Sequence, residues 1–339
     1  SNASRGLGDV YKRQVQIGQK DLLIETQGNW GNILTGDSAA ASRYIEARLS
    51  KFALEVVYSP KITKWQSSYD GRRKEPINLP VKFPLLLAQG AEGIAVGLST
   101  KILPHNFVEL IDASIKCLKG RRFDLYPDFP TEGVIDVTAY NDGLRGGKIK
   151  VRAKINQVNK NTLMISQIPY TTTSTSLIES ILKANDKGKI KIKKIEDNTS
   201  SDVEILVHLP NGVSPDKTID GLFAFSNCEV SISPLSCIIE NNKPVFIGVS
   251  EILKKSTENT KDLLKDELEV KLKELNLLWH YSTLEKIFIE NRIYRLIEEQ
   301  DTWEGVLNSI KDGLKPHLNL LKNEVSEDDI VKLTAVSYT

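Results

Sequence analysis

The chain has 339 residues, which is too long for one compact core, so two or three modules are expected. Its hydrophobic content of 40% and charged content of 26% are ordinary for a soluble protein, the longest apolar runs are far shorter than a membrane span, and no secretory signal is visible. The three cysteines and four histidines show no metal-ligand spacing, which gives no candidate metal site and is typical of reduced thiols in a cytoplasm.

The two ends differ from the rest of the sequence. Ser1-Asn2-Ala3 resembles the short segment that remains after an affinity tag is removed. Asp9 to Gln14 back-translates to a transposon end used in sequencing libraries, and Ala335 to Thr339 matches its reverse complement. We therefore expect residues 1–14 and 335–339 to be tag- and cloning-derived; the alternative is a pair of natural flexible termini.

A helix is predicted from Ser38 to Leu49, after a turn-rich stretch that contains Gly28, Gly31 and Gly36. Asp37 or Ser38 is a candidate N-cap. The apolar stripe of this predicted helix is formed by residues four positions apart: Ala41, Ile45, Leu49 and Ala53.

Tyr44 lies outside that stripe, with Arg43 beside it and Arg48 one turn further on. A phenol is a poor nucleophile at neutral pH unless cations stabilise the phenolate, and two arginines supply part of that field. The alternative is a tyrosine at the boundary of an ordinary amphipathic helix.

The segment from Pro60 to Asn106 carries seven Lys/Arg and three Asp/Glu, a surplus that suits phosphate contacts or a solvated face. Within it, Asp70-Gly71 predicts a tight turn, and the following Pro- and Gly-rich run predicts short strands broken by bends. Asn106 is predicted to cap a helix, with Glu109 in a capping-box position. The predicted core face of this helix is Leu110, Ile111, Ile115 and Leu118.

Residues 133–244 are rich in predicted strands. The first has apolar residues alternating with a basic face made of Lys148, Lys150, Arg152 and Lys154. A second strand is predicted over residues 189–193, and a third has one apolar face made of Val203, Ile205, Val207 and Leu209. Between the first two strands, a short helix is entered from Pro169. The basic faces suit phosphates, although solvation alone is the alternative.

From Leu263 the apolar residues recur in steps of three and four over about thirty residues, which predicts a long helix with a coiled-coil-like seam. Residues 303–321 add one or two further helices. The predicted seam is formed by Leu264, Leu268, Leu272, Leu275 and Trp279, then Ile289, Ile293 and Leu296.

Two long segments carry a resemblance to a known family. Residues 28–51, GNWGNILTGDSAAASRYIEARLSK, resemble the active-site segment of the cleavage subunit of type IIA DNA topoisomerases. Residues 92–106, EGIAVGLSTKILPHN, follow at the spacing of that family. The resemblance runs from about Val15 to Thr334. In sequence it is more similar to the topoisomerase IV cleavage subunit than to the gyrase cleavage subunit.

The resemblance implies roles for single residues. Tyr44 would attack a DNA phosphodiester and hold the strand end as a phosphotyrosine ester, with Arg43 stabilising charge on the phosphate and Arg48 a weaker candidate. Ile94 resembles the family's wedge residue, which slips between base steps and bends the DNA. The alternative for Ile94 is an ordinary buried isoleucine.

The resemblance also implies an α+β, multi-domain fold. Residues 15–72 would be the C-terminal part of a winged-helix domain, 73–250 a tower domain, 251–300 a coiled-coil arm, and 301–334 part of the helices of a lower gate. Regions that complete the winged helix and the lower gate would lie beyond the two ends. The fragment alone is therefore expected to be inactive.

The implied partners are double-stranded DNA, a second copy of the cleavage subunit, and the ATPase subunit in an A2B2 assembly, with no membrane. That ATPase subunit would bind ATP and supply Mg²⁺ to the tyrosine in trans. The location would be the bacterial cytoplasm, at the nucleoid.

Three other functions are alternatives to this one. The cleavage subunit of a gyrase is the near alternative, since the distinguishing wrapping motif would lie beyond this chain. A non-catalytic DNA-binding scaffold would use the arm for dimerisation and the basic faces for duplex. A single-subunit nuclease is disfavoured because no metal cluster or general base is visible.

Overall fold

The computed structural model describes residues 2–336 and the side chains of residues 11–335. It divides into two compact units, Ser1–Asp262 and Leu263–Thr339, with the boundary inside a long helix, and each unit is described by itself. Of the expected cloning-derived ends, Ser1 and residues 337–339 lie outside the described residues. Asn2 to Gln14 form part of the first helix, and Ala335 and Val336 end the last one.

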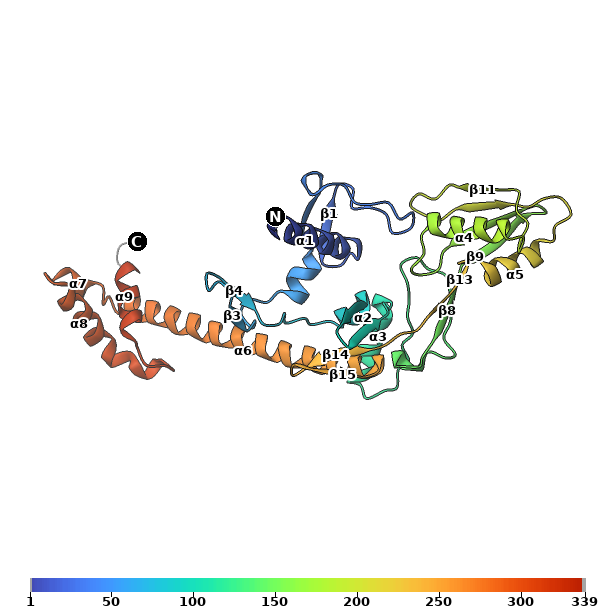
Figure 1. Cartoon of the computed structure of the whole chain (residues 1–339). Helices are drawn as coiled ribbons and strands as arrows, with labels where there is room; N and C mark the ends of the chain where they lie inside the picture. Colours follow the sequence, from blue (N-terminus) through green and yellow to red (C-terminus); the bar gives the residue numbers. More distant parts are fainter. Residues whose placement is uncertain (1, 337–339) are drawn as a thin grey trace. The chain divides into compact units, whose positions relative to one another are not determined.

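The N-terminal part of the first unit contains short elements joined by turns (Figure 1). Its strands form three separate antiparallel pairs, β1 with β2, β3 with β4, and β5 with β6. The elements are α1 (Asn2–Gln19), β1 (Ile24–Gln27), the 3-10 turn η1 (Ser42–Tyr44), β2 (Glu46–Leu49), the π-helical turn η2 (Ala53–Val57), β3 (Trp65–Ser67), β4 (Lys74–Pro76), α2 (Leu85–Gln89), β5 (Ala91–Ala95), β6 (Leu98–Ile102) and α3 (Phe107–Leu118).

The rest of the first unit is richer in strands. Its sheets have the orders β13-β8-β7, β11-β12-β10-β9 and β14-β15, and every pairing is antiparallel. The elements are β7 (Val134–Asp136), the 3-10 turn η3 (Asn141–Gly143), β8 (Ile149–Arg152), β9 (Lys154–Asn159), β10 (Thr162–Gln167), α4 (Ser174–Asp186), β11 (Lys194–Asp197), β12 (Ile205–His208), α5 (Pro215–Phe225), β13 (Glu229–Ile232), β14 (Cys237–Glu240), β15 (Lys243–Phe246) and the start of α6 (Val249–Glu290). Helices beside antiparallel sheets confirm the predicted α+β class.

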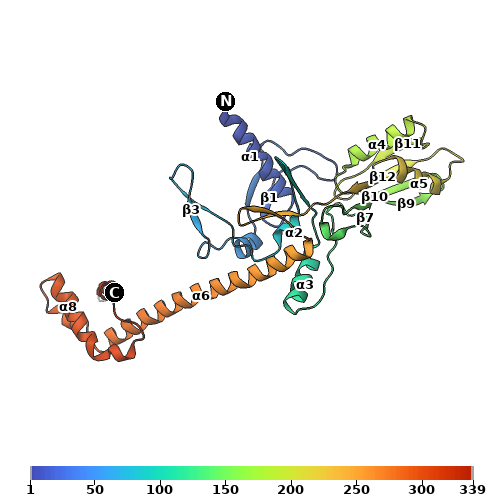
Figure 2. The ribbon, with the colours of Figure 1, turned by 60° about the horizontal axis from the view of Figure 1, so that its bottom comes forward.

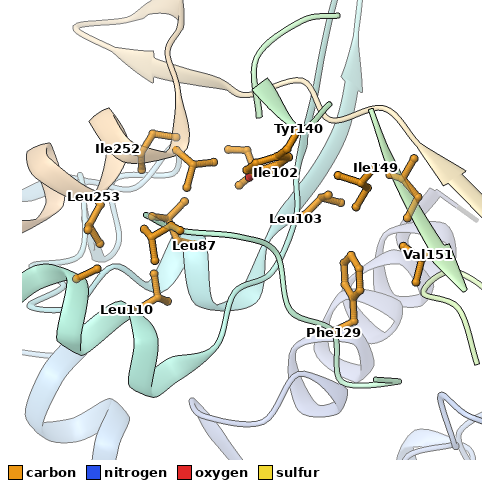
Figure 3. Close-up of a cluster of buried hydrophobic side chains, with 14 of the residues drawn as sticks. Leu87, Ile102, Leu103, Leu110, Phe129, Tyr140, Ile149, Val151, Ile252 and Leu253 are labelled. Carbon is orange, nitrogen blue, oxygen red and sulfur yellow. The ribbon is translucent and has the colours of Figure 1, made fainter. Parts of the chain in front are cut away.

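Two hydrophobic cores stabilise the first unit. One packs α2, α3, the end of β6 and the start of α6 against β8, and Figure 3 shows Leu87, Ile102 and Leu253 meeting there. The other lies under the four-stranded sheet, where Leu177 and Ile181 of α4 pack on the sheet's inward residues. Burial of such side chains from water supplies the main stabilising free energy of each core.

The second unit consists of helices. After the C-terminal part of α6 come α7 (Arg295–Glu298), α8 (Trp303–Leu314), the 3-10 segment η4 (Lys315–Leu320) and α9 (Glu327–Val336). Its core joins Leu284 and Phe288 of α6 to Ile310 of α8 and Leu333 of α9. The predicted long helix and the predicted helix within residues 303–321 are both confirmed, although α6 ends at Glu290, so Ile293 and Leu296 lie beyond it.

The helix predicted around Tyr44 is wrong. Residues 46–49 instead form β2, which pairs with β1 in the register Glu25↔Arg48. Of the predicted apolar stripe only Ala53 is buried, and Leu49 is 41% exposed. Pairing with a strand about twenty residues earlier has overridden local helix propensity, so neither Asp37 nor Ser38 caps a helix here.

Two smaller predictions also need correction. Residues 189–193 are not a strand, because β11 begins at Lys194. In α3, Asn106 accepts hydrogen bonds from the backbone N–H groups of Val108 and Glu109, so the predicted cap is confirmed. Of the predicted core face, only Leu110 is fully buried; the exposed members are Ile111, Ile115 and Leu118.

Other predictions are confirmed. Asp70-Gly71 lies in the turn between β3 and β4, where the Gly71 N–H donates to the Ser68 carbonyl at 2.8 Å. The helix after Pro169 is α4. The predicted apolar face of the third strand is buried at all four of its residues. No helix among the described residues combines the length and apolar character needed to cross a membrane.

Candidate DNA-cleavage site

Tyr44 is the last residue of a single 3-10 turn that leads into β2. The Tyr44 N–H donates to the Ala41 carbonyl at 2.9 Å, and Ile45 then takes an extended conformation. The Tyr44 side chain is 65% exposed although it is a large aromatic. Its hydroxyl is therefore accessible to a large substrate such as a nucleic acid backbone.

Arg43 lies against this tyrosine. Its guanidinium carbon is 4.8 Å from the centroid of the Tyr44 ring, within the range of a cation–π contact. Both residues are exposed, and the described structure gives Arg43 no carboxylate partner. The turn thus brings together a phenol hydroxyl and a guanidinium of the kind that can bind a phosphate oxygen.

The glycine-rich stretch before the turn packs directly on its backbone. Gly28 has φ +93, and a Cβ placed there would lie 2.6 Å from the Tyr44 carbonyl oxygen. Gly31 has φ +82, and its Cβ would lie 2.5 Å from the Asp37 carbonyl oxygen. The Ala40 N–H also donates to the Asn29 carbonyl at 2.9 Å. Only glycine allows this close approach of two backbones.

Trp30 links this glycine-rich stretch to α1. Its indole is 9% exposed and donates to the Gln27 carbonyl at 3.0 Å, while Gln19 of α1 donates to the Trp30 carbonyl at 2.8 Å. Gly18 of α1 faces the indole so closely that a Cβ there would lie 2.5 Å from the ring. The glycine-rich stretch that packs on the tyrosine turn is therefore itself held against α1 through Trp30.

Arg48, the weaker of the two candidate arginines, forms an ion pair with Glu25. Its Nε lies 2.6 Å from the Glu25 Oε2 across the β1–β2 pair. Both side chains are exposed, so the pair contributes little stability, but it offsets the arginine's charge. Of the two predicted cations, the structure places only Arg43 against the tyrosine.

Ile94 lies near the tip of the β5–β6 hairpin and is 91% exposed. This contradicts the alternative of an ordinary buried isoleucine. Val96, in the turn directly after β5, is fully exposed and was not predicted from the sequence. Two exposed aliphatic side chains together at a hairpin tip are unusual on a surface that faces only water.

The base of the hairpin is anchored in the first core. Ile102 is 4% exposed, and Thr100 donates through its hydroxyl to the Cys237 carbonyl at 2.9 Å. Lys101 and Leu235 exchange backbone hydrogen bonds of 2.8 and 3.0 Å. The hairpin thus presents exposed apolar side chains on an anchored base, and apolar side chains are the kind that some DNA-binding proteins insert between base steps.

The predicted basic face is divided between two sheets. Lys148, Lys150, Arg152 and Lys154 are all exposed, but β8 ends at Arg152, and Lys154 begins β9 of the other sheet. Glu229 on β13 pairs with two of them, at 3.6 Å from Lys150 and 2.5 Å from Arg152. The hydrogen bond from Arg152 holds the pKa of the Glu229 carboxyl below its usual range. The predicted alternation is confirmed, because Ile149, Val151 and Ala153 are buried between the four exposed basic residues, although Glu229 offsets half of the charge on this face.

A metal site would need acidic side chains gathered beside the tyrosine. Among the described residues, no group of three or more His, Cys, Asp or Glu side chains is arranged to hold a metal ion. The nearest acid along the chain, Glu46, is exposed at the start of β2. The turn presents a phenol hydroxyl and a guanidinium, and these two groups are not a metal donor set.

Comparison with known proteins identifies the family. The family described as the A subunit of DNA gyrase/topoisomerase IV matches residues 9–338. The chain belongs to this family. The A subunit of DNA topoisomerase 4 from Borreliella burgdorferi is 43% identical over 327 residues, which cover 96% of this chain and 52% of that protein.

Gyrase subunits are more distant relatives of this family member. The DNA gyrase A subunit of Metamycoplasma arthritidis is 31% identical over 324 residues, covering 88% of this chain and 36% of the gyrase. The DNA gyrase A subunit of Brachyspira hyodysenteriae is 28% identical over 338 residues, covering 90% of this chain and 40% of that gyrase. The chain thus spans about half the length of the topoisomerase 4 protein and a smaller share of the gyrases.

Proposed function

We propose that this chain is part of the DNA-breaking and rejoining subunit of an ATP-dependent type IIA topoisomerase, similar to the A subunit of topoisomerase IV. The observation that carries the proposal is the exposed Tyr44 hydroxyl beside the Arg43 guanidinium, in a chain of this family. The higher identity to a topoisomerase 4 subunit than to the gyrase subunits favours topoisomerase IV over gyrase.

The proposed reaction exchanges one phosphate ester for another. The Tyr44 oxygen bonds to a backbone phosphorus, and the bond from that phosphorus to one deoxyribose oxygen breaks. The phenolic proton leaves Tyr44, and the departing deoxyribose oxygen is protonated to a free hydroxyl. The phosphotyrosine ester keeps the bond energy of the broken strand, so the reverse attack reseals the DNA without an external energy source.

Arg43 is proposed to stabilise the negative charge that develops on the attacked phosphate. Its guanidinium already lies beside the nucleophile, so little movement separates the resting contact from a phosphate contact. Arg48 is proposed to bind the DNA backbone in a subsidiary role, because its charge is shared with Glu25. The proposed catalytic pair is therefore Tyr44 and Arg43.

Ile94 is proposed as the wedge that enters between base pairs and bends the duplex. Its 91% exposure and the buried base of its hairpin support this role. The exposed basic residues are proposed to contact phosphates, with Lys148 and Lys154 carrying more of that contact because Glu229 offsets the other two. The set proposed for phosphate contact is Lys148, Lys150, Arg152 and Lys154.

The remaining assignments follow the family resemblance. We propose a partial winged helix at residues 15–72, a tower at 73–250, a coiled-coil arm at 251–300 and lower-gate helices at 301–334. The complete protein would form a homodimer and an A2B2 complex with the ATPase subunit, at the bacterial nucleoid. Mg²⁺ and ATP would be held by the ATPase subunit, and Mg²⁺ would offset phosphate charge when bound.

The test is a cleavage assay trapped with denaturant. A full-length protein carrying this sequence is mixed with its ATPase partner and end-labelled duplex DNA, then quenched in detergent. A covalent protein–DNA adduct, absent from the Tyr44→Phe variant, supports the proposal. DNA binding without any adduct would favour the non-catalytic scaffold instead.

A further inference from the structure

The β3–β4 hairpin concentrates a positive charge that the proposed cleavage site does not use. Five of the seven basic residues between Pro60 and Asn106 lie from Lys61 to Lys74, on or beside this hairpin. Its strands are exposed on both faces apart from half-buried Pro76, and Figure 2 shows the hairpin extended away from α1 and α2 of the same unit. Isolated two-stranded hairpins are marginally stable in water and gain stability from a partner.

The tip of the hairpin has a fixed conformation. Ser68 donates through its hydroxyl to Asp70 at 2.6 Å, and the Arg72 N–H donates to the same carboxyl oxygen at 3.1 Å. The Arg73 N–H donates to the Ser68 hydroxyl at 3.1 Å. The Ser68 hydrogen bond holds the pKa of the Asp70 carboxyl below its usual range. The carboxyl group of Asp70, the one acid of the tip, is thus hydrogen-bonded within the turn itself.

The outward side chains of the tip are cations and one phenol. Arg72, Arg73 and Lys74 are exposed, and within the described residues none of them has an ion-pair partner. Tyr69 is fully exposed at 108%. The other acid of the hairpin, Glu75, accepts a hydrogen bond from Gln66 across the strands at 3.0 Å.

We propose that the tip of this hairpin is a second contact for duplex DNA, separate from the cleavage site. A two-stranded ribbon has the width of the DNA major groove, and the groove is bordered by two rows of phosphates. Arg72 and Arg73 lie in the bend and Lys74 begins β4, and the long side chains of all three are exposed, so together they can reach both rows. The Tyr69 hydroxyl is a phosphate donor of the kind common in protein–DNA complexes.

Charge complementarity favours DNA over an acidic protein as the occupant. Protein interfaces are built around a buried apolar or aromatic centre, whereas the outward side chains of this tip are charged or polar apart from one phenol ring. The contact requires no particular base sequence, since the three cations and the Tyr69 hydroxyl are all proposed to contact phosphates. This inference rests on the proposed function, because it takes DNA as the substrate.

The test measures how DNA affinity depends on salt. The chain is titrated onto a fluorescein-labelled duplex of random sequence across a salt series, followed by fluorescence anisotropy. In the triple variant R72A/R73A/K74A we expect the slope of log K against log salt to become shallower by about 2 to 3, because each lost phosphate contact removes about 0.9. Circular dichroism checks that the variant is folded.

Two further variants sharpen the test. The control K116A/K119A/R121A removes three exposed basic residues around the end of α3 and is expected to keep the parent slope. Tyr69→Phe is expected to weaken binding about fivefold without changing the slope, because a neutral hydroxyl releases no counterion. An unchanged affinity for Tyr69→Phe would remove Tyr69 from the contact.

The outcomes separate this inference from the proposed function. A parent chain that binds with a steep slope, together with an unchanged slope in R72A/R73A/K74A, overturns the hairpin contact alone. Equal losses in both triple variants overturn it too, because binding would then follow net charge. Unchanged DNA binding with loss of binding to the ATPase subunit would make that protein the occupant. A parent chain without salt-dependent DNA binding would overturn the proposed function as well.

Discussion

Tyr44 and Ile94 are both exposed near the tips of short elements, but their backbones are held in different ways. The Tyr44 turn is pressed against Gly28, where even one added carbon would collide with it. Ile94 projects just beyond the part of its hairpin that is anchored through Thr100, Lys101 and Ile102. A nucleophile must be positioned to a fraction of an ångström, whereas a wedge needs apolar surface and reach. The difference predicts that substitutions near the turn affect chemistry and those at the tip affect DNA bending.

The largest effect is expected for Tyr44→Phe. Loss of the oxygen proposed to attack the phosphate should lower the rate of strand cleavage by at least about 10⁴-fold. DNA affinity should stay within about threefold, because the aromatic ring and Arg43 remain. Single-turnover cleavage and anisotropy measure the two quantities. Residual cleavage at the same positions would identify another nucleophile.

Arg43→Ala should slow cleavage by about 10²-fold, the usual loss when one donor to a developing anion is removed. Arg43→Lys keeps the charge but loses the planar fork, so it should recover part of the rate. Single-turnover kinetics compares the three proteins. A parent rate in the alanine variant would leave Arg43 with a packing role only.

Gly28→Ala should slow cleavage by about tenfold, because the added Cβ displaces the Tyr44 backbone. Gly212→Ala is the matched control: Gly212 has φ +83 but no atom within 4 Å of the added Cβ. Both variants are expected to lose about 1 kcal/mol of unfolding free energy from the positive φ. Thermal unfolding and cleavage are measured together. Equal cleavage rates in the two variants would show that the close contact does not position Tyr44.

The smallest effect on rate is expected for Ile94→Ala, at a few-fold. The bend of the bound duplex should decrease, while the salt dependence of binding stays unchanged, since an apolar side chain releases no counterions. Energy transfer between dyes at the duplex ends measures the bend. Ile239→Ala, at another exposed isoleucine, is the control and should behave as the parent. An unchanged bend for Ile94→Ala would contradict the wedge assignment.

Local patterns predicted much of the fold. The seam from Leu264 to Trp279 predicted the long helix α6, and the Asn106 cap and the Asp70-Gly71 turn were also predictable, because each depends on neighbouring residues. The Tyr44 conformation was not predictable in this way. Its stretch is alanine-rich and favours a helix locally, but pairing with residues 24–27 determines the strand.

For the site residues too, the sequence did not reveal contacts with distant parts of the chain. The sequence identified Tyr44, Arg43 and Ile94 as candidates, but it could not distinguish free charges from paired ones. Arg152 is offset by Glu229, 77 residues further along the chain. The role of Gly28 as a support depends on packing, and its only sequence signal was a turn-rich run of glycine and asparagine. Pairings between distant segments are decided by the fold, so sequence patterns alone do not reveal them.

The most direct test of the central claim is to locate the covalent bond. The trapped protein–DNA adduct is digested with nuclease and protease, and the peptides are sequenced by mass spectrometry. We predict a nucleotide attached to Tyr44, in the peptide that follows Arg43. A nucleotide on another exposed tyrosine, such as Tyr58, or on any serine, would contradict the account.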